Sequence, residues 1–185
     1  MRKIILASKS PRRKELMDLI GIEVEIDVVE TSELFRNDVA ITVAVEEVAK
    51  QKALAVSEKH KEDIIISADT IVLLGNEILG KPHSENEAFY MLSRLRNRKH
   101  QVITSVCILC DDRMEQFSSV TEVEMMNYSD EMIRNYVQTK EPMDKAGAYG
   151  IQGKGAVLVK AIHGDYYTVM GLPLAELFKR LQKYL

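Results

Sequence analysis

The segment from Ser8 to Arg13, SKSPRR, combines residue types that bind anions. It follows a short apolar run, Ile4 to Ala7, and its Ser10-Pro11 pair is typical of a helix start, with a hydroxyl at the cap and proline at the first helical position. Unpaired N–H groups at a helix start favour a phosphate, and arginine adds bidentate hydrogen bonds to phosphate oxygens. The alternative is a capped surface helix with solvated arginines, and this segment alone leaves both interpretations open.

Two charged residues lie where the surrounding pattern is apolar. Asp69 follows the apolar run Ile64 to Ile66 at the end of a predicted strand, where open α/β sheets place ligand sites. Its carboxylate could hold a divalent metal, take a proton from an attacking water, or only cap the following turn. Lys52 lies within the apolar stripe of a predicted helix, so its ammonium must either reach the helix edge or meet a buried anion.

A long segment from Glu141 to Gly155, EPMDKAGAYGIQGKG, is too glycine-rich and polar to be a packed element. It lacks the glycine and lysine spacing of a P-loop, but the Gln152 amide has a donor and an acceptor that could recognise the edge of a base. A flexible surface loop is the alternative. Lys81, in Gly80-Lys81-Pro82, is either a solvated turn lysine or a phosphate ligand.

Strands and helices alternate along the chain, and no repeat or linker divides it. The sequence therefore predicts one α/β domain over residues 1–185, with a mixed, twisted sheet flanked by helices. The expected strands are 4–7, 22–29, 64–70, 77–79, 101–109, 120–126, 156–162 and 166–170, and the expected helices are 11–20, 41–59, 84–96, 129–139 and 173–184.

Composition excludes several classes of protein. With 46% hydrophobic and 29% charged residues the chain is an ordinary globular mixture, and a net charge of -3 gives no general basis for nucleic-acid binding. Neither a secretory signal nor an apolar run near the roughly 20 residues of a membrane helix is present, so we expect a cytoplasmic protein. Cys107 and Cys110 fall in a β-rich run, where an offset of three predicts ordinary strand cysteines on opposite faces.

Four stretches closely resemble the Maf family of nucleoside triphosphate pyrophosphatases, and the match runs nearly end to end. These stretches are ASKSPRRKEL from Ala7, SADT from Ser67, GKP from Gly80 and EPMDKAGAYGIQG from Glu141. The resemblance implies an inosine-triphosphatase-like α/β fold with a cleft between two lobes, a divalent cation, Mg²⁺ or Mn²⁺, and usually a homodimer. It also implies hydrolysis of a nucleoside triphosphate to the monophosphate and pyrophosphate.

The resemblance further implies roles for individual residues. Asp69 would be catalytic, activating water to attack the α-phosphorus, and would share a metal with Glu33. The positions that set substrate choice match the branch of the family acting on dTTP and UTP, and further positions would line the pocket. The first group is Arg12, Thr70 and Gln152, and the second is Ser8, Arg13, Glu33, Lys52 and Lys81.

Two other functions stay open at this point. One is a nucleotide-binding regulator of septum formation or cell division, a role associated with the family, in which catalysis would be secondary. The other is a phosphatase that releases orthophosphate, because phosphate-binding groups alone do not choose which bond breaks. A measurement of turnover distinguishes the regulator from an enzyme. Identification of the products distinguishes the orthophosphate-releasing phosphatase from a pyrophosphatase.

Overall fold

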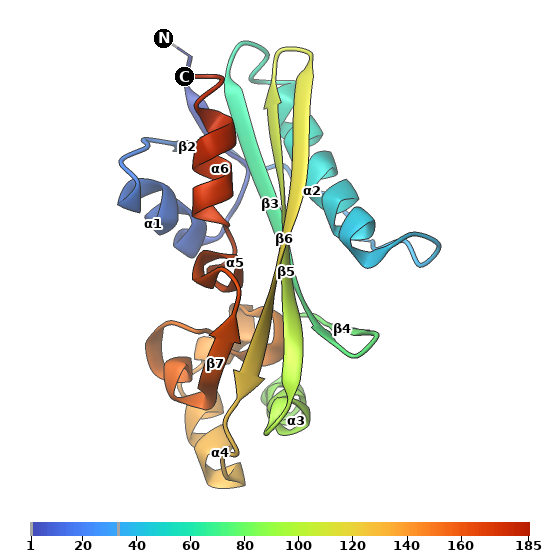
Figure 1. The fold of residues 1–185 in the computed structure, drawn as a ribbon, viewed down its shortest axis with the longest axis vertical. Coiled ribbons are helices and arrows are strands. Elements are labelled where there is room, and N and C mark those ends of the chain that lie inside the picture. Colours follow the sequence, from blue (N-terminus) through green and yellow to red (C-terminus); the bar gives the residue numbers. More distant parts are fainter. Residues whose placement is uncertain (1, 33) are drawn as a thin grey trace. The chain divides into compact units, whose positions relative to one another are not determined.

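The computed structural model describes residues 2–32 and 34–185, and it has the alternating α/β order that the sequence predicts (Figure 1). Three short 3₁₀ segments, η1 to η3, lie in the glycine-rich region. In chain order the elements are β1 (Ile4–Leu6), α1 (Pro11–Leu19), β2 (Glu25–Ile26), α2 (Ile41–Ser57), β3 (Ile64–Leu74), β4 (Glu77–Leu79), α3 (Glu85–Leu95), β5 (Lys99–Cys110), β6 (Arg113–Met125), α4 (Asp130–Gln138), η1 (Glu141–Asp144), η2 (Ala146–Ala148), η3 (Gly153–Leu158), β7 (Val159–His163), α5 (Tyr166–Met170) and α6 (Leu174–Leu181).

Within the described residues, seven strands form one mixed sheet in the order β2-β1-β3-β5-β6-β7, with β4 paired to β3. β1 runs parallel to β2 and β3, and its last residue, Leu6, is in register with Ile66. β3 and β4 form an antiparallel hairpin, and β6 pairs antiparallel with β7, which follows it only after α4 and the glycine-rich segment. The predicted α/β class and mixed sheet are therefore confirmed.

The chain divides into two compact units, and three long strands contribute residues to both. Unit 1 comprises residues 1–69, 104–119 and 171–185, and unit 2 comprises residues 70–103 and 120–170. The division falls between Asp69 and Thr70 on β3, and it also interrupts β5 and β6. A single domain over 1–185 stays a prediction, because each unit has a hydrophobic core of its own.

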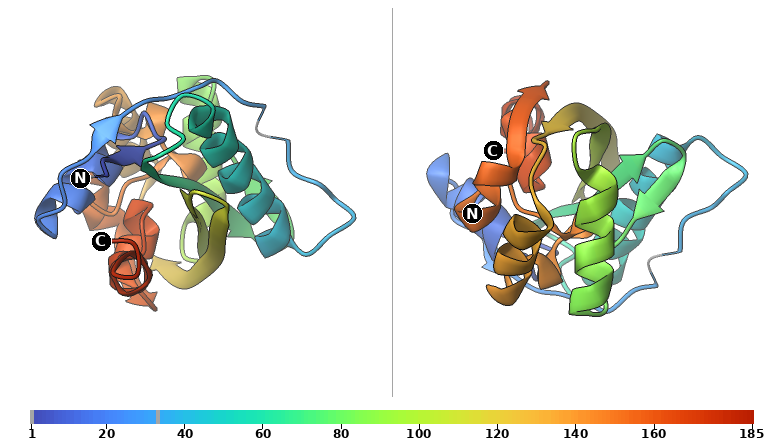
Figure 2. Two further views of the ribbon diagram at one scale, coloured as in Figure 1. Left: turned by 90° about the horizontal axis from the view of Figure 1, so that it is seen from above. Right: turned by 90° about the horizontal axis from the view of Figure 1, so that it is seen from below.

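In unit 1, α2 packs against one face of the strands, and Figures 1 and 2 show α1 and α6 on the opposite side. Helix α2 has the predicted amphipathic stripe. Small apolar residues on one side of α2 therefore pack against every second residue of the strands. This cluster is Ile5, Ala7, Ala49, Ala53, Val56, Ile65, Cys107 and Leu109.

In unit 2, α3 and α4 pack together over the ends of the strands. Both helices begin as predicted, because the Ser84 hydroxyl accepts from the Glu87 N–H and the Ser129 hydroxyl accepts from the Met132 N–H. Their buried faces join residues of β3, β6 and the glycine-rich segment in one core. Its helical members are Ala88, Met91, Leu92, Leu95, Ile133, Tyr136 and Val137.

Several expected elements differ from the structure. Residues 166–170 form helix α5 instead of a strand, because the Asp165 carboxylate accepts from the Thr168 N–H at 2.6 Å and caps a helical turn that the β-type composition of this segment hides. The expected strand 22–29 is reduced to Glu25–Ile26, and residues 153–158 are 3₁₀ before β7 begins. β3 continues past Thr70 to Leu74.

The two cysteines are ordinary strand residues, as predicted. Cys107 belongs to the cluster beneath α2, whereas the Cys110 sulfur accepts a hydrogen bond from the Arg2 guanidinium at 2.9 Å, and both thiols are free and buried. Among the described residues, no helix is both long and apolar enough to cross a membrane.

Candidate active site

The Asp69 carboxylate meets the Lys52 ammonium in unit 1. The two side chains lie 2.6 Å apart, from Nζ to Oδ1, and are only 16% and 9% exposed. Lys52 therefore meets a buried anion, which was one of the two outcomes left open by the sequence. A charge pair this well shielded is held by the fold, because neither partner can be left alone without a large desolvation cost.

The contact between Lys52 and Asp69 follows from the side-chain periodicity of helix α2 and strand β3. Alternate residues of β3 point to one face, so Ile65, Ser67 and Asp69 all face α2. Ile65 packs in the apolar cluster, the Ser67 hydroxyl donates to the Ala49 carbonyl at 2.5 Å, and Asp69 meets Lys52. Contacts between β3 and α2 thus change from apolar to polar to ionic along the strand.

Asp69 does not end its strand, and this corrects the sequence-based placement. β3 runs five residues further, so Asp69 lies in its middle. The strand beside it ends earlier, because β1 stops at Leu6, opposite Ile66. Asp69 is three residues beyond that last pair and lies past the carboxyl end of β1, which preserves the strand-end character on which the prediction rested.

The segment after β1 is organised around the buried hydroxyl of Ser8. This oxygen accepts from the Ser10 N–H at 3.2 Å and from the Arg13 guanidinium at 3.0 Å, and Arg13 also donates through Nε to the Gly171 carbonyl at 2.8 Å. Ser10 precedes helix α1 and Pro11 opens it, as predicted, but the Ser10 side chain makes no capping hydrogen bond. Ser8 shapes this turn instead.

The first turn of α1 carries two arginines and no acidic residue. Positive charge at a helix start opposes the helix dipole, so Arg12 and Arg13 are mildly unfavourable there unless an anion compensates them. Arg12 is half-buried, and nearby Lys9 forms an exposed pair with Glu30 at 3.0 Å. Unit 1 thus contains Ser8, Arg12, Arg13, Lys52 and Asp69, and among them Ser8 contacts Arg13 and Lys52 contacts Asp69.

Three further predicted residues, Thr70, Lys81 and Gln152, belong to unit 2. Thr70 and Gln152 are half-buried and Lys81 is exposed. The turn containing Lys81 is tied to the glycine-rich segment, because the Gly147 N–H donates to the Gly80 carbonyl at 3.0 Å. A methyl group on Gly147 would lie 3.0 Å from the side chain of Val72, so this segment packs directly on β3 two residues beyond Thr70.

The segment from Glu141 to Gly155 is more compact than predicted. It forms three 3₁₀ segments, and Pro142, Ala148 and Tyr149 are buried in the core of unit 2. Ala148 has a φ of 59°, a left-handed conformation that costs a non-glycine residue about 1–2 kcal/mol. The glycines of this segment allow close packing, whereas the glycine-rich composition alone predicts a flexible loop.

Two residues of this region have contacts that the sequence did not indicate. The Tyr136 hydroxyl donates to the Glu141 carboxylate at 3.0 Å and accepts from the Gly150 N–H at 3.1 Å. Tyr136 was hidden because it lies on the apolar face of α4, where a tyrosine predicts a core residue. Glu141 was part of the recognised stretch but had no role assigned to it.

Candidate metal ligands do not cluster in the part of the chain that the structure describes. No group of three or more histidine, cysteine, aspartate or glutamate residues gathers there, and Glu33 lies outside the described residues. Among residues 2–32 and 34–185, side chains of these four types therefore form no metal site by themselves. In Mg²⁺ sites of another kind, one or two carboxylates and the phosphates of a ligand supply the oxygens.

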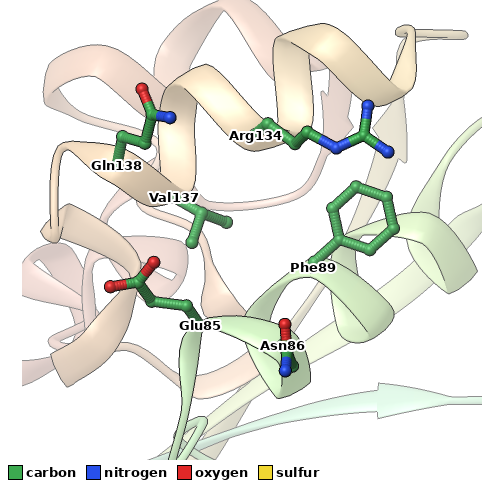
Figure 3. Close-up of a pocket in the computed structure, with 6 residues that line it drawn as sticks. All are labelled: Glu85, Asn86, Phe89, Arg134, Val137 and Gln138. Carbon is green, nitrogen blue, oxygen red and sulfur yellow. The ribbon is translucent and has the colours of Figure 1, made fainter.

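A groove of about 400 Å³ lies elsewhere, between α3 and α4 (Figure 3). Phe89 and Val137 form its apolar part, and the Arg134 guanidinium lies 5.3 Å from the centre of the Phe89 ring. The groove contains none of the residues predicted for the site. Its shape therefore says nothing about them.

Similar solved structures define the class of fold. A HAM1 protein from Coxiella burnetii superposes with a TM-score of 0.56 over 99% of this chain and 100% of that one, at 17% identity. The Staphylococcus aureus Ham1 protein gives 0.54 over 100% and 91%, at 14% identity. The fold is that of Ham1 proteins, in agreement with the predicted class.

Sequence comparison gives the family. A profile described as Maf-like protein matches residues 3–184, and the chain belongs to this family. A protein named dTTP/UTP pyrophosphatase from Bacillus velezensis is 49% identical over 99% of this chain and 97% of its own length. Another of the same name from Bacillus cereus is 47% identical over 100% and 96%. The resemblance found in the four stretches is confirmed.

Proposed function

We propose that this protein hydrolyses dTTP and UTP to the monophosphate and pyrophosphate. The buried Lys52–Asp69 pair carries the proposal, because it places a carboxylate and a cation past the carboxyl end of β1, the strand that leads into the SKSPRR turn. Relatives at 47% and 49% identity over nearly the whole chain have this activity in their names. Pyrimidine nucleotides with modified bases are further substrates to test.

Asp69 is proposed as the general base. A water oxygen attacks the α-phosphorus, its proton passes to the Asp69 carboxylate, and the bond between the α-phosphorus and the bridging oxygen breaks. Pyrophosphate leaves with the electron pair of that bond. Lys52 orients Asp69 through the 2.6 Å contact, and cationic side chains offset the charge that develops on the phosphates.

A divalent cation, Mg²⁺ or Mn²⁺, fits the donor set. Asp69 would supply a carboxylate, the triphosphate would supply further oxygens, and Glu33 is a second proposed ligand. Such an ion polarises phosphoryl oxygens and neutralises their charge. Removal of metal by a chelator should abolish turnover, and added Mg²⁺ or Mn²⁺ should restore it.

The remaining residues divide by chemistry. Ser8, Arg12, Arg13, Lys52 and Lys81 are proposed to bind the triphosphate, because hydroxyl, guanidinium and ammonium groups all donate to phosphate oxygens. Thr70, Gln152 and Arg12 are proposed to set substrate choice. An amide such as Gln152 offers a donor and an acceptor together, which matches the N3–H and carbonyl oxygens of thymine and uracil.

Replacement of the proposed base tests the mechanism. Asp69→Asn keeps the side-chain shape but removes the proton acceptor, so kcat for release of pyrophosphate from dTTP should fall by about 10²–10⁴. Asp63→Asn is the matched control, because Asp63 accepts from the Lys3 N–H at 3.1 Å and from His60 immediately before the same strand. Near-normal turnover in Asp69→Asn, with metal present, would show that this mechanism is wrong.

Identification of the products separates the proposal from its alternatives. Pyrophosphate and the monophosphate are expected, and orthophosphate would indicate a phosphatase. Binding of dTTP without turnover would instead favour a nucleotide-binding regulator of septum formation. We also propose that the protein is a cytoplasmic homodimer without bound nucleic acid. The mass in solution tests for the homodimer, and the ratio of nucleic-acid to protein absorbance of the purified protein tests for bound nucleic acid.

A further inference from the structure

The segment that carries Gln152 is closed on itself in unit 2. A methyl group built on Gly155 would lie 2.4 Å from the Gly150 carbonyl oxygen, so the backbone at these two positions is almost in contact. Gln152 lies between them with a half-buried side chain. The position of the Gln152 backbone therefore depends on how firmly the two ends of this short turn are held.

Both ends are held by the same pair of side chains, Tyr136 and Glu141. At one end, the Gly150 N–H donates to the Tyr136 hydroxyl at 3.1 Å. At the other, the Lys154 N–H donates to Glu141 Oε2 at 3.0 Å and the Gly155 N–H donates to Glu141 Oε1 at 3.1 Å. The Tyr136 hydroxyl donates to Glu141 Oε1 at 3.0 Å, which joins the two ends in one network.

The glycines of the turn are required by this network. Gly153 has a φ of 70°, and a methyl group there would lie 2.8 Å from the Glu141 carboxylate. A methyl group on Gly155 would lie 2.6 Å from the Tyr136 hydroxyl. The backbone thus approaches the two side chains as closely as it can, and side chains at either position would push it away.

The protonation states of Glu141 and Tyr136 favour hydrogen bonding to the backbone. Burial acts to raise the pKa of Glu141, but the N–H groups of Lys154 and Gly155 and the Tyr136 hydroxyl lower it below its usual value. Burial raises the pKa of Tyr136, so its hydroxyl stays neutral and can donate and accept at once. A charged acceptor makes the stronger hydrogen bonds, and Glu141 receives three.

We propose that Tyr136 and Glu141 are positioning residues for recognition of the base, acting by fixing the Gly150–Gly155 turn and with it the Gln152 amide. This inference rests on the proposed function. Neither residue touches the reacting atoms, and their effect is on the choice between nucleotides and not on phosphate chemistry.

The test uses conservative substitutions in the full-length protein. Tyr136→Phe removes only the hydroxyl, and Glu141→Gln removes the charge and replaces one of the two accepting oxygens by an NH2 group that can only donate. The matched control is Tyr128→Phe, because Tyr128 is buried in the same core and its hydroxyl donates to the Leu92 carbonyl of α3 at 2.8 Å. Thermal unfolding of each variant shows whether its fold is kept.

Three quantities are measured for each protein: kcat/KM for dTTP divided by that for dCTP, dATP and dGTP, the inhibition constant of pyrophosphate, and amide hydrogen exchange at residues 150, 154 and 155. A misplacement of about 1 Å costs roughly 10²-fold in a reaction, so selectivity for dTTP should fall by about 10–100-fold in Tyr136→Phe and Glu141→Gln. Inhibition by pyrophosphate should not change, exchange at the three amides should accelerate, and the control should behave as wild type.

Several outcomes would overturn the inference. Wild-type selectivity in both folded variants would show that the network does not position the base. An equal fall for all four nucleotides, or a weaker inhibition by pyrophosphate, would indicate a general structural role. If the wild-type protein releases no pyrophosphate from dTTP or UTP, the proposed function fails first, while faster exchange in the variants would still show that the network holds the turn.

Discussion

The Lys52–Asp69 pair gives a prediction whose size follows from its geometry. Coulomb's law with an effective dielectric constant of about 20 gives an attraction of roughly 6 kcal/mol for unit charges at 2.6 Å. Desolvation of the two ions opposes several kcal/mol of this, because both side chains are less than one fifth exposed. Lys52→Met keeps most of the side-chain volume but leaves the carboxylate without its cation, and we expect the free energy of unfolding to fall by about 3–5 kcal/mol.

A double-mutant cycle isolates the pair from the other consequences of each change. Urea unfolding is measured for wild type, Lys52→Met, Asp69→Asn and the double variant at neutral pH. Because each single variant leaves a buried polar partner behind, the double variant should be less destabilised than the two single changes added together. The expected coupling energy is about 1–3 kcal/mol.

Salt and a second pair provide the control for this cycle. The exposed Lys9–Glu30 pair, at 3.0 Å, should give a coupling energy below about 1 kcal/mol that weakens further in salt. The coupling of Lys52 with Asp69 should survive the same salt. A coupling energy within about 0.5 kcal/mol of zero for the buried pair would refute the reasoning, because independent sites add to within that range.

Three further predictions concern the glycine-rich segment and a buried thiol. Gly155→Ala should lower the free energy of unfolding by at least about 1–3 kcal/mol, because its methyl group would lie 2.4 Å from a carbonyl oxygen. Gly80→Ala is the control, because no atom lies within 4 Å of its methyl group, and its free energy of unfolding should stay within about 0.5 kcal/mol of wild type. Urea unfolding measures both differences. The lowered pKa of Glu141 means that its charge stabilises the fold above the unfolded pKa, and that this contribution is lost as pH falls through the folded pKa, so the stability difference between wild type and Glu141→Gln should shrink from about pH 6 to pH 3. Burial raises the pKa of Cys107 to about 12, so a thiol reagent at about pH 8 should modify it only after unfolding, and fast labelling of the native protein would contradict its burial.

The elements that begin or end at clear capping or turn residues were predictable from sequence. The starts of α3 and α4 follow from Ser84 and Ser129, and the β3–β4 hairpin follows from Gly75-Asn76, because caps and turns are local interactions. Helix α5 was not predictable from composition, because Tyr-Tyr-Thr-Val-Met favours a strand and the contacts of the Asp165 carboxylate with the Thr168 N–H and hydroxyl decide otherwise.

The candidate site shows the same division between local and distant information. Asp69 and Lys52 were recognisable because charge within an apolar pattern is unusual, but their contact joins residues 17 positions apart and depends on which face of β3 meets α2. The hydroxyl of Tyr136 and the carboxylate of Glu141 had no comparable signal, because a tyrosine on an apolar helix face and a glutamate before a proline both have commoner explanations.

The SKSPRR turn and the glycine-rich segment are built on opposite principles. In the turn, Ser8 and Arg13 use part of their hydrogen-bonding capacity on each other and on backbone, which fixes their positions before any anion arrives. In the glycine-rich segment, the hydrogen bonds that hold the turn on either side of Gln152 are made by the backbone N–H groups of Gly150 and Gly155. Substitutions that weaken phosphate binding should therefore act through side chains, whereas substitutions that change base selectivity can act from residues that never touch the nucleotide.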